Sequence, residues 1–248
     1  MAQVWTYTIV SVLLVSIISL VGIVTLSFPK ALLKKILLFL VSFATGALFG
    51  GVFFHLLPEA ADDGWNLAIS LYILAGIILF FVFEKFIRWR HCHEPTNDEH
   101  PHHLAPMNLL GDGIHNFTDG LIIAGSYLVS VPLGMATTLA VVFHEIPQEI
   151  GDFGILIYAG YSIKKALILN FLIALTAFLG AIVTLIISSK IGNISSILVP
   201  FAAGGFIYIA GSDLLPELHK EVILWKSFLQ LISFLLGIAL MAALILIE

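Results

Sequence analysis

Long apolar runs, separated by short polar or turn-forming segments, make up most of the chain. Each run has about 20 or more residues, which is enough for an α-helix to cross a hydrocarbon layer of roughly 30 Å. The breaks contain charged, proline and glycine residues, as in FPKALLKK, PEAADDG and SVPLG. The pattern predicts eight membrane-spanning helices, at residues 4–26, 36–57, 65–87, 107–129, 134–159, 166–188, 194–215 and 222–247.

Composition supports a polytopic membrane protein. Of the 248 residues, 60% are hydrophobic and 11% are charged, and the mean hydropathy is +1.07. About a quarter of the residues in a soluble domain are charged. We therefore expect an all-α polytopic membrane protein with one transmembrane domain over residues 1–248, in contact with the lipid bilayer and without a nucleic-acid partner.

Lysine and arginine residues predict the orientation, because they collect on the cytoplasmic side of membrane proteins. If the N-terminus lies outside, ten of the eleven fall on the cytoplasmic side, and Lys190 is the exception. Both termini are then extracellular or periplasmic. The start MAQVWTYTIV has no basic region or cleavage site, so we interpret it as a retained first span. The absence of a long outer domain favours the plasma membrane, which is the inner membrane in a Gram-negative bacterium.

An internal similarity relates the second and seventh predicted spans. Residues 44–60 and 202–218 share six of seventeen positions without a gap, including LLPE. In the predicted topology these spans run in opposite directions, as in the inverted repeats of transporters. A pseudo-inverted repeat implies a 3+2+3 arrangement of helices. The alternative is that LLPE is only a helix-end motif.

Polar side chains form one stripe along each of the fourth and fifth predicted spans. Their spacing places each stripe on a single helical face. The fourth span contributes Asp112, His115, Asn116 and Asp119, and the fifth contributes His144, Glu145, Gln148, Glu149 and Asp152. A charge at the bilayer centre costs ~2.5–3.5 kcal/mol. We therefore expect the two stripes to face each other or a water-filled cavity.

The chemistry of the stripes favours a metal ion. Neither span contains lysine or arginine that could compensate the carboxylates. Carboxylates together with neutral imidazoles are typical ligands of a divalent cation. A proton relay and a purely structural polar core are the alternatives.

Proline and glycine residues suggest how these two spans accommodate a site. Pro147 cannot donate a hydrogen bond to the Phe143 carbonyl, so we expect a kink there. Small residues allow helices to approach closely, and we expect this of Gly120, Gly125, Gly151 and Gly154.

Further polar residues lie at helix ends and in one loop. His55 and Glu59 end the second span, and Asp213, Glu217 and His219 end the seventh. They are either entrance and exit groups of a pathway or ordinary residues at headgroup level. The predicted cytoplasmic loop 88–106 contains His91, Cys92, His93, His100, His102 and His103. Such a tract indicates loose metal capture, and an ordinary solvated loop is the alternative.

These residues resemble the ZIP zinc/iron permeases. The similarity lies in HNFTDG (115–120), HEIPQEIGDFGIL (144–156), HLLPEA and GSDLLPEL. It is closest to the branch of that family whose fifth span carries HExPHExGD. The resemblance covers almost the whole chain and implies eight spans, with import of a divalent transition metal without ATP or a prosthetic group.

The resemblance also implies roles for the stripe residues. His115, Asp119, His144 and Gln148 match the main transport site. Asn116 and Glu145 match a neighbouring second site, which Asp119 can bridge. Asp112, Glu149 and Asp152 would be supporting or pathway groups.

The chain departs from the family pattern at two positions. Gln148 replaces the second histidine of HExPHE, and an amide oxygen is a weaker and harder ligand than imidazole. We therefore expect weaker zinc binding than in relatives with histidine there. The sixth span has Asn170 as its main polar group and no carboxylate, so the second site lacks an anionic ligand from that span.

The sequence thus predicts a transporter, not an enzyme, that moves zinc, or else iron, manganese or cadmium, into the cytoplasm by alternating access. A metal-selective channel or a metal sensor would need the same ligands. An intramembrane zinc hydrolase is a further alternative, because HE followed by a ligand resembles HExxH, but Gln148 and Pro147 are unfavourable for it. Whether the chain forms a homodimer is left open by the sequence.

Overall fold

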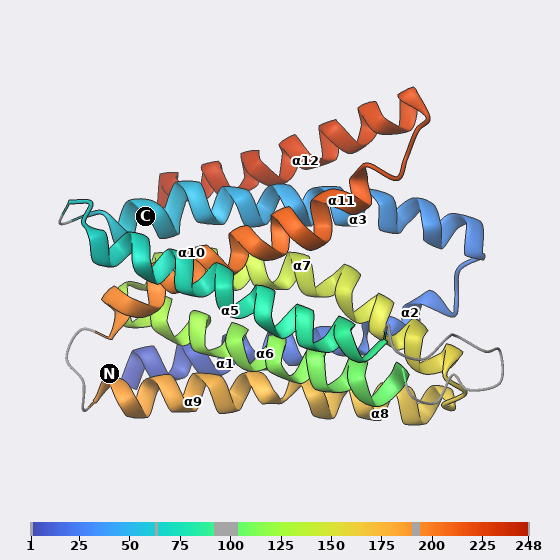
Figure 1. Ribbon diagram of the computed structural model, residues 1–248, viewed down its shortest axis with the longest axis horizontal. Helices are drawn as coiled ribbons and strands as arrows, with labels where there is room; N and C mark the ends of the chain where they lie inside the picture. Colours follow the sequence, from blue (N-terminus) through green and yellow to red (C-terminus); the bar gives the residue numbers. More distant parts are fainter. Residues whose placement is uncertain (1, 63, 92–103, 190–193, 248) are drawn as a thin grey trace.

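The computed structural model describes residues 2–62, 64–91, 104–189 and 194–247. These residues form helices and short connections and contain no β-strand. The helices run roughly along the long axis of the molecule (Figure 1). In chain order they are α1 (Ala2–Ile18), η1 (Ser19–Val21), α2 (Gly22–Thr25), α3 (Lys30–Gly51), η2 (Val52–Leu56), α4 (Leu57–Ala60), α5 (Leu67–His91), α6 (Leu104–Val129), α7 (Val131–Tyr158), α8 (Ile163–Ala174), α9 (Thr176–Ser188), α10 (Ser195–Tyr208), η4 (Ile209–Leu214), α11 (Leu215–Leu218), α12 (Leu224–Leu244) and η5 (Ile245–Ile247).

Six helical segments are long and apolar enough to cross a membrane. They are Ala2–Thr25, Lys35–Ala60, Leu67–Lys85, Ile163–Ser188, Ser195–Leu218 and Leu224–Leu244. The chain is therefore a multi-pass membrane protein. Helices α6 and α7, with 26 and 28 residues, are also long enough, but their polar stripes make them less apolar than the other six.

Local contacts and backbone conformation explain where helix α7 begins and where it ends. The Ser130 hydroxyl accepts a hydrogen bond from the Leu133 amide at 3.2 Å, which caps the first turn. At the other end Gly160 has a φ of +85°, a conformation that favours glycine and ends the helix. Between these points α7 continues through Pro147 without interruption.

Pairs of glycines bring three pairs of helices into backbone contact. A Cβ atom added at Gly120 of α6 would lie 1.9 Å from the Ala177 carbonyl oxygen of α9, and one at Gly180 of α9 would lie 1.9 Å from that of Phe117. Any side chain at either position would therefore push the helices apart. Corresponding glycines join α3 to α12 (Gly46 and Gly237) and α5 to α10 (Gly76 and Gly204).

The expectation for two other glycines was wrong. Gly151 and Gly154 of α7 are exposed, and an added Cβ atom would meet nothing within 4 Å at either position. Gly125 of α6 does lie close to a neighbour, since its Cβ would be 3.1 Å from the Leu198 Cβ of α10. Helix spacing around α7 is thus not set by these two glycines.

The two segments that resemble each other in sequence also share their local structure. A π-helix, η2 or η4, interrupts each helix at corresponding positions, and a short α-helix with proline in its first turn follows. The segments α3 and α10 run in opposite directions (Figure 1). The similarity therefore extends to an unusual backbone feature as well as to LLPE.

Candidate metal site

Four side chains of α6 and α7 bring their ligand atoms together. His115 and Asp119 come from α6, and His144 and Glu145 come from α7. Each offers one ligand atom, and the four atoms lie within 4.8 Å of one another. We refer to these residues as the ligand quartet.

The separations within the quartet fit a tetrahedral ion. The two histidine Nε2 atoms are 3.1 Å apart. Their distances to Asp119 Oδ2 and Glu145 Oε1 range from 3.2 to 3.6 Å. Ligands placed tetrahedrally at 2.0–2.2 Å from Zn²⁺ would be roughly 3.3–3.6 Å apart. Little movement is therefore needed for these atoms to surround one ion.

The orientation of His144 is set by the backbone of its own helix. Its Nδ1 donates a hydrogen bond to the Ala140 carbonyl oxygen at 3.0 Å. The proton therefore resides on Nδ1 in the neutral ring, and the Nε2 lone pair faces the quartet. Phe206 packs against this ring with centroids 5.8 Å apart, and Phe80 packs against His115 at 6.2 Å.

The carboxylates of the quartet are buried with unused hydrogen-bonding capacity. Asp119 and Glu145 are fully buried and His144 is 1% exposed. All four oxygen atoms of the two carboxylates lack a hydrogen bond within the described part of the chain. Buried carboxylate oxygens without a hydrogen bond are costly, so these residues suit a bound cation.

A second polar group lies next to the quartet, towards the start of α6. Asp112, Glu149 and Asp152 each offer an oxygen atom, and these atoms lie within 4.8 Å of one another. We refer to them as the carboxylate trio. Asn116 donates to Asp112 Oδ1 at 2.7 Å, and Asn170 of α8 donates to Glu149 Oε2 at 3.1 Å.

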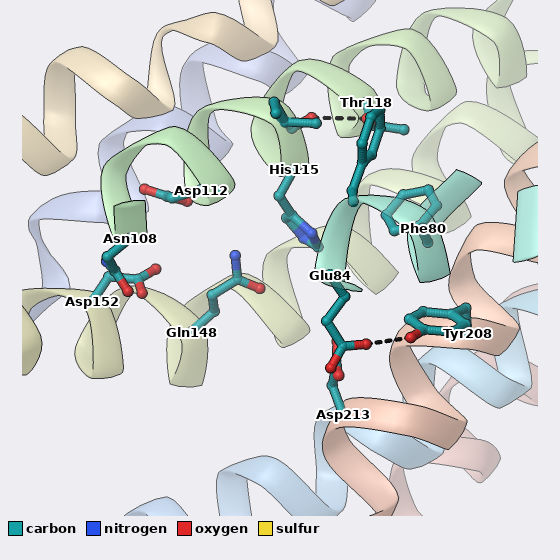
Figure 2. A pocket seen from close by; sticks show the side chains of 13 residues that line it. Phe80, Glu84, Asn108, Asp112, His115, Thr118, Gln148, Asp152, Tyr208 and Asp213 are labelled. Atoms are coloured by element: carbon teal, nitrogen blue, oxygen red, sulfur yellow. Dashed lines mark hydrogen bonds between the residues drawn. The ribbon is translucent and has the colours of Figure 1, made fainter. Parts of the chain in front are cut away.

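A cavity of about 220 Å³ connects with both groups. Figure 2 shows side chains from α5, α6, α7, α10 and η4 around it. His115 is the member of the quartet that lines it, with a side chain 14% exposed. The other lining residues are Phe80, Phe83, Glu84, Asn108, Gly111, Asp112, Ile114, Thr118, Gln148, Asp152, Tyr208 and Asp213.

On the opposite side of the quartet the helices are closely packed. Ile122 and Ile123 of α6 and Ala140 and Val141 of α7 are buried in the main hydrophobic core. Nearer the end of α6, the Tyr127 hydroxyl shares a hydrogen bond with the Ser11 hydroxyl of α1 at 2.9 Å. The described residues thus enclose the quartet on one side and leave a cavity on the other.

The structure groups the predicted metal ligands differently from the main and second sites that the resemblance implies. Glu145 lies within the quartet, 3.2 Å from His115 Nε2. Gln148 lines the cavity beside His115 (Figure 2), and Asn116 contacts the trio through Asp112. Metal ligation by each of these residues stays a prediction.

The predicted pathway residues at the helix ends have separate surroundings. Nε2 of His55 donates to the Met241 carbonyl oxygen at 2.8 Å, which connects η2 to α12. Glu59 is exposed and lines a small pocket with Asp62. Asp213 lines the cavity, whereas Glu217 pairs with Lys220 on the surface and His219 is exposed.

Of the predicted loop ligands, one falls within the described residues. His91 is the last residue of α5. Cys92, His93, His100, His102 and His103 lie outside the described residues.

Three cavity residues were not singled out by the sequence. The Tyr208 hydroxyl donates a hydrogen bond to Glu84 Oε2 across the cavity wall (Figure 2). Asn108 lies beside Asp152. The lone carboxylate in the apolar run FFVFEKF was a signal for Glu84, because an ionisable residue there needs a polar neighbour.

The fold and the site together define a class: a multi-pass, all-helical membrane protein with a buried cluster of histidine and carboxylate ligands between two helices. The profile of the family "ZIP Zinc transporter" matches residues 2–106 and 102–245. This chain belongs to the ZIP zinc transporter family.

Curated relatives carry the same family name. Zinc transporter ZIP13 of Pongo abelii is 38% identical over 218 residues, which cover 82% of this chain and 65% of the relative. Zinc transporter ZIP13 of Mus musculus is 35% identical over 248 residues, covering 83% and 69%. The ZIP13 homolog of Drosophila melanogaster is 33% identical over 274 residues, covering 84% and 77%.

Proposed function

We propose that this protein transports divalent metal ions, with zinc as the first candidate and iron, manganese or cadmium as alternatives. The transport site would consist of the ligand quartet, with Gln148 and Asn116 as additional ligands. The observation that carries the proposal is the set of quartet separations of 3.1–3.6 Å among ligand atoms of α6 and α7. The names of the relatives support zinc as the substrate.

We further propose that α6 and α7 also span the membrane, giving eight spans in a 3+2+3 arrangement within one domain. The ends of α5 and α11 and the beginnings of α3, α8 and α12 lie at one end of the bundle (Figure 1), and lysines cluster there in the sequence. The marked N- and C-termini lie at the other end. By the positive-inside rule the lysine-rich end is cytoplasmic, and both termini are outside. We assign the protein to the plasma membrane.

The position of the cavity suggests a direction. Its lining comes from the parts of α5, α6 and α7 nearest the lysine-rich end. The quartet is closely packed on the opposite side. This asymmetry supports an inward-facing state of a carrier that imports metal by alternating access.

The arrangement around Glu145 favours transport over hydrolysis. In an HExxH hydrolase the glutamate acts as a base rather than as a ligand. Here Glu145 Oε1 lies among the ligand atoms, 3.2 Å from His115 Nε2 and 3.5 Å from His144 Nε2. We therefore propose that Glu145 binds the transported ion and that the protein is not an enzyme.

Flux measurements in liposomes test this function. With a metal-sensitive dye inside, the purified protein should give saturable entry of Zn²⁺, Fe²⁺, Mn²⁺ or Cd²⁺. Asp119→Ala and His144→Ala should each abolish entry, because each removes a quartet ligand.

The exposed Asp62→Ala is the matched control and should retain flux. All variants should elute as the folded protein in size-exclusion chromatography. No flux of any divalent metal by the wild type, or full flux in both quartet variants, would contradict the proposal. Entry that rises without saturation would indicate a channel instead of a carrier.

A further inference from the structure

We propose that the carboxylate trio is a second divalent-cation site, built from oxygen ligands and separate from the ligand quartet. The inference rests on the proposed function in one respect, which is that ions pass between the quartet and the cavity. The trio lies next to that route, since Asp112 and Asp152 line the cavity and point into it (Figure 2).

Two of the three carboxylates are held in place by amides and keep one oxygen atom free. Asn116 donates to Asp112 Oδ1 at 2.7 Å and Asn170 donates to Glu149 Oε2 at 3.1 Å. Asp112 Oδ2 and Glu149 Oε1 then have no donor within the described residues, although these side chains are 5% and 0% exposed. Asp152 Oδ2 is also buried, and the Asn108 amide is its neighbouring donor.

The anchoring amides add further unpaired acceptors. Asn116 and Asn170 are both fully buried. Each uses its NH₂ group toward the trio, and each has a side-chain oxygen without a partner. Around the trio the described residues leave one buried donor unpaired, Asn108 Nδ2. Around the trio, buried oxygen acceptors without a hydrogen bond therefore outnumber buried donors without one. A bound cation would interact with these oxygen atoms.

No ion pair among the described residues includes a carboxylate of the trio. The ion pairs of the described residues involve the quartet or the surface lysines and leave these three carboxylates out. Three carboxylates buried within 4.8 Å of one another repel strongly in a medium of low dielectric constant. A divalent ion would offset that repulsion directly.

The donor atoms indicate the kind of ion. Carboxylate and amide oxygens suit hard cations such as Mn²⁺, whereas the imidazoles of the quartet suit zinc. Glu145 of the quartet and Glu149 of the trio are four residues apart on α7, so the two ions would be about 6 Å apart along the helix. Two divalent ions that close repel each other, and occupation of the trio should therefore weaken binding at the quartet.

Counting bound Mn²⁺ tests the proposal. Equilibrium dialysis of the protein in lipid nanodiscs should give two Mn²⁺ per wild-type chain. The isosteric double variant Glu149→Gln/Asp152→Asn should give one, and so should His144→Ala. Electron paramagnetic resonance should show broadening by the nearby second Mn²⁺ in the wild type and a single-ion spectrum in either variant.

The matched control is Asp62→Asn/Glu221→Gln, which removes the same charge away from the trio and should still bind two ions. One Mn²⁺ per wild-type chain would overturn the proposal, as would two ions in the trio variant. If the double variant does not fold, the single variants Glu149→Gln and Asp152→Asn are counted instead, and two ions in both of them would overturn the proposal. If the wild type carries zinc but binds one Mn²⁺ per chain, the trio is not a cation site and the transport function still stands. If it binds two Mn²⁺ and carries no metal, the transport function is contradicted and the trio site still stands.

Discussion

At the residue scale, the local backbone prepares His144 before any ion binds. The Ala140 carbonyl accepts the Nδ1 proton, so the Nε2 lone pair already faces Asp119 at 3.2 Å. Ala140 and His144 are four residues apart, and any helix would bring these two groups close together. The sequence therefore predicted the polar stripe, but the contact with Asp119 required the position of α6.

Gln148 is the position where we expect metal selectivity to be set. It lines the cavity beside His115 and is one helical turn from His144. In Gln148→His an imidazole would replace a weak amide ligand. Zinc binding should therefore tighten by about tenfold, or about 1.4 kcal/mol.

Competition with a zinc-binding dye measures this dissociation constant. Gln3→His, which adds a histidine at the exposed start of α1, should leave it unchanged. Equal affinities in Gln148→His and the wild type would mean that residue 148 is not a ligand.

At the element scale, reciprocal glycines fix the distance between paired helices. The apolar pattern predicted the helices, and Gly120 was expected to allow close approach. Its partner Gly180, 60 positions later in the chain, could not be identified without the packing of α6 against α9. The failed expectation for Gly151 and Gly154 has the same origin, because a small residue looks alike in sequence whether it faces a helix or the surface.

This difference predicts opposite effects of two alanine substitutions. Gly120→Ala places a methyl group 1.9 Å from a backbone oxygen, which should lower the free energy of unfolding by about 1–3 kcal/mol or more. Gly154→Ala meets no atom within 4 Å and should be neutral or stabilising by up to about 1 kcal/mol. Thermal unfolding of the detergent-solubilised protein, followed by tryptophan fluorescence, measures both. A similar melting temperature for the two variants would contradict the tight α6–α9 contact.

At the scale of the whole molecule, the cavity lies on one side of the quartet and a closely packed core lies on the other. Cysteine accessibility can test this asymmetry, because Cys92 is the single native cysteine and can be replaced by serine. In that background Asn108→Cys lines the cavity, while Ser126→Cys replaces a side chain that is 1% exposed near the far end of α6.

A membrane-impermeant thiol reagent should modify Asn108→Cys from the cytoplasmic side of oriented vesicles. Ser126→Cys should stay unmodified from either side as long as the inward-facing state predominates. Modification of Asn108→Cys from the outer side alone would reverse the orientation that we propose.

The sequence by itself determined the features that depend on local geometry. Apolar runs of sufficient length predicted a helical membrane protein, and residues spaced by three or four positions had to share a helical face. Tertiary structure decided which atoms meet. Glu145 joins the quartet, Tyr208 reaches Glu84 across 124 residues, and His55 reaches Met241 across 186. These contacts depend on the rotation and offset of one helix against another, which follow from the packing of side chains from distant parts of the chain and not from any local pattern.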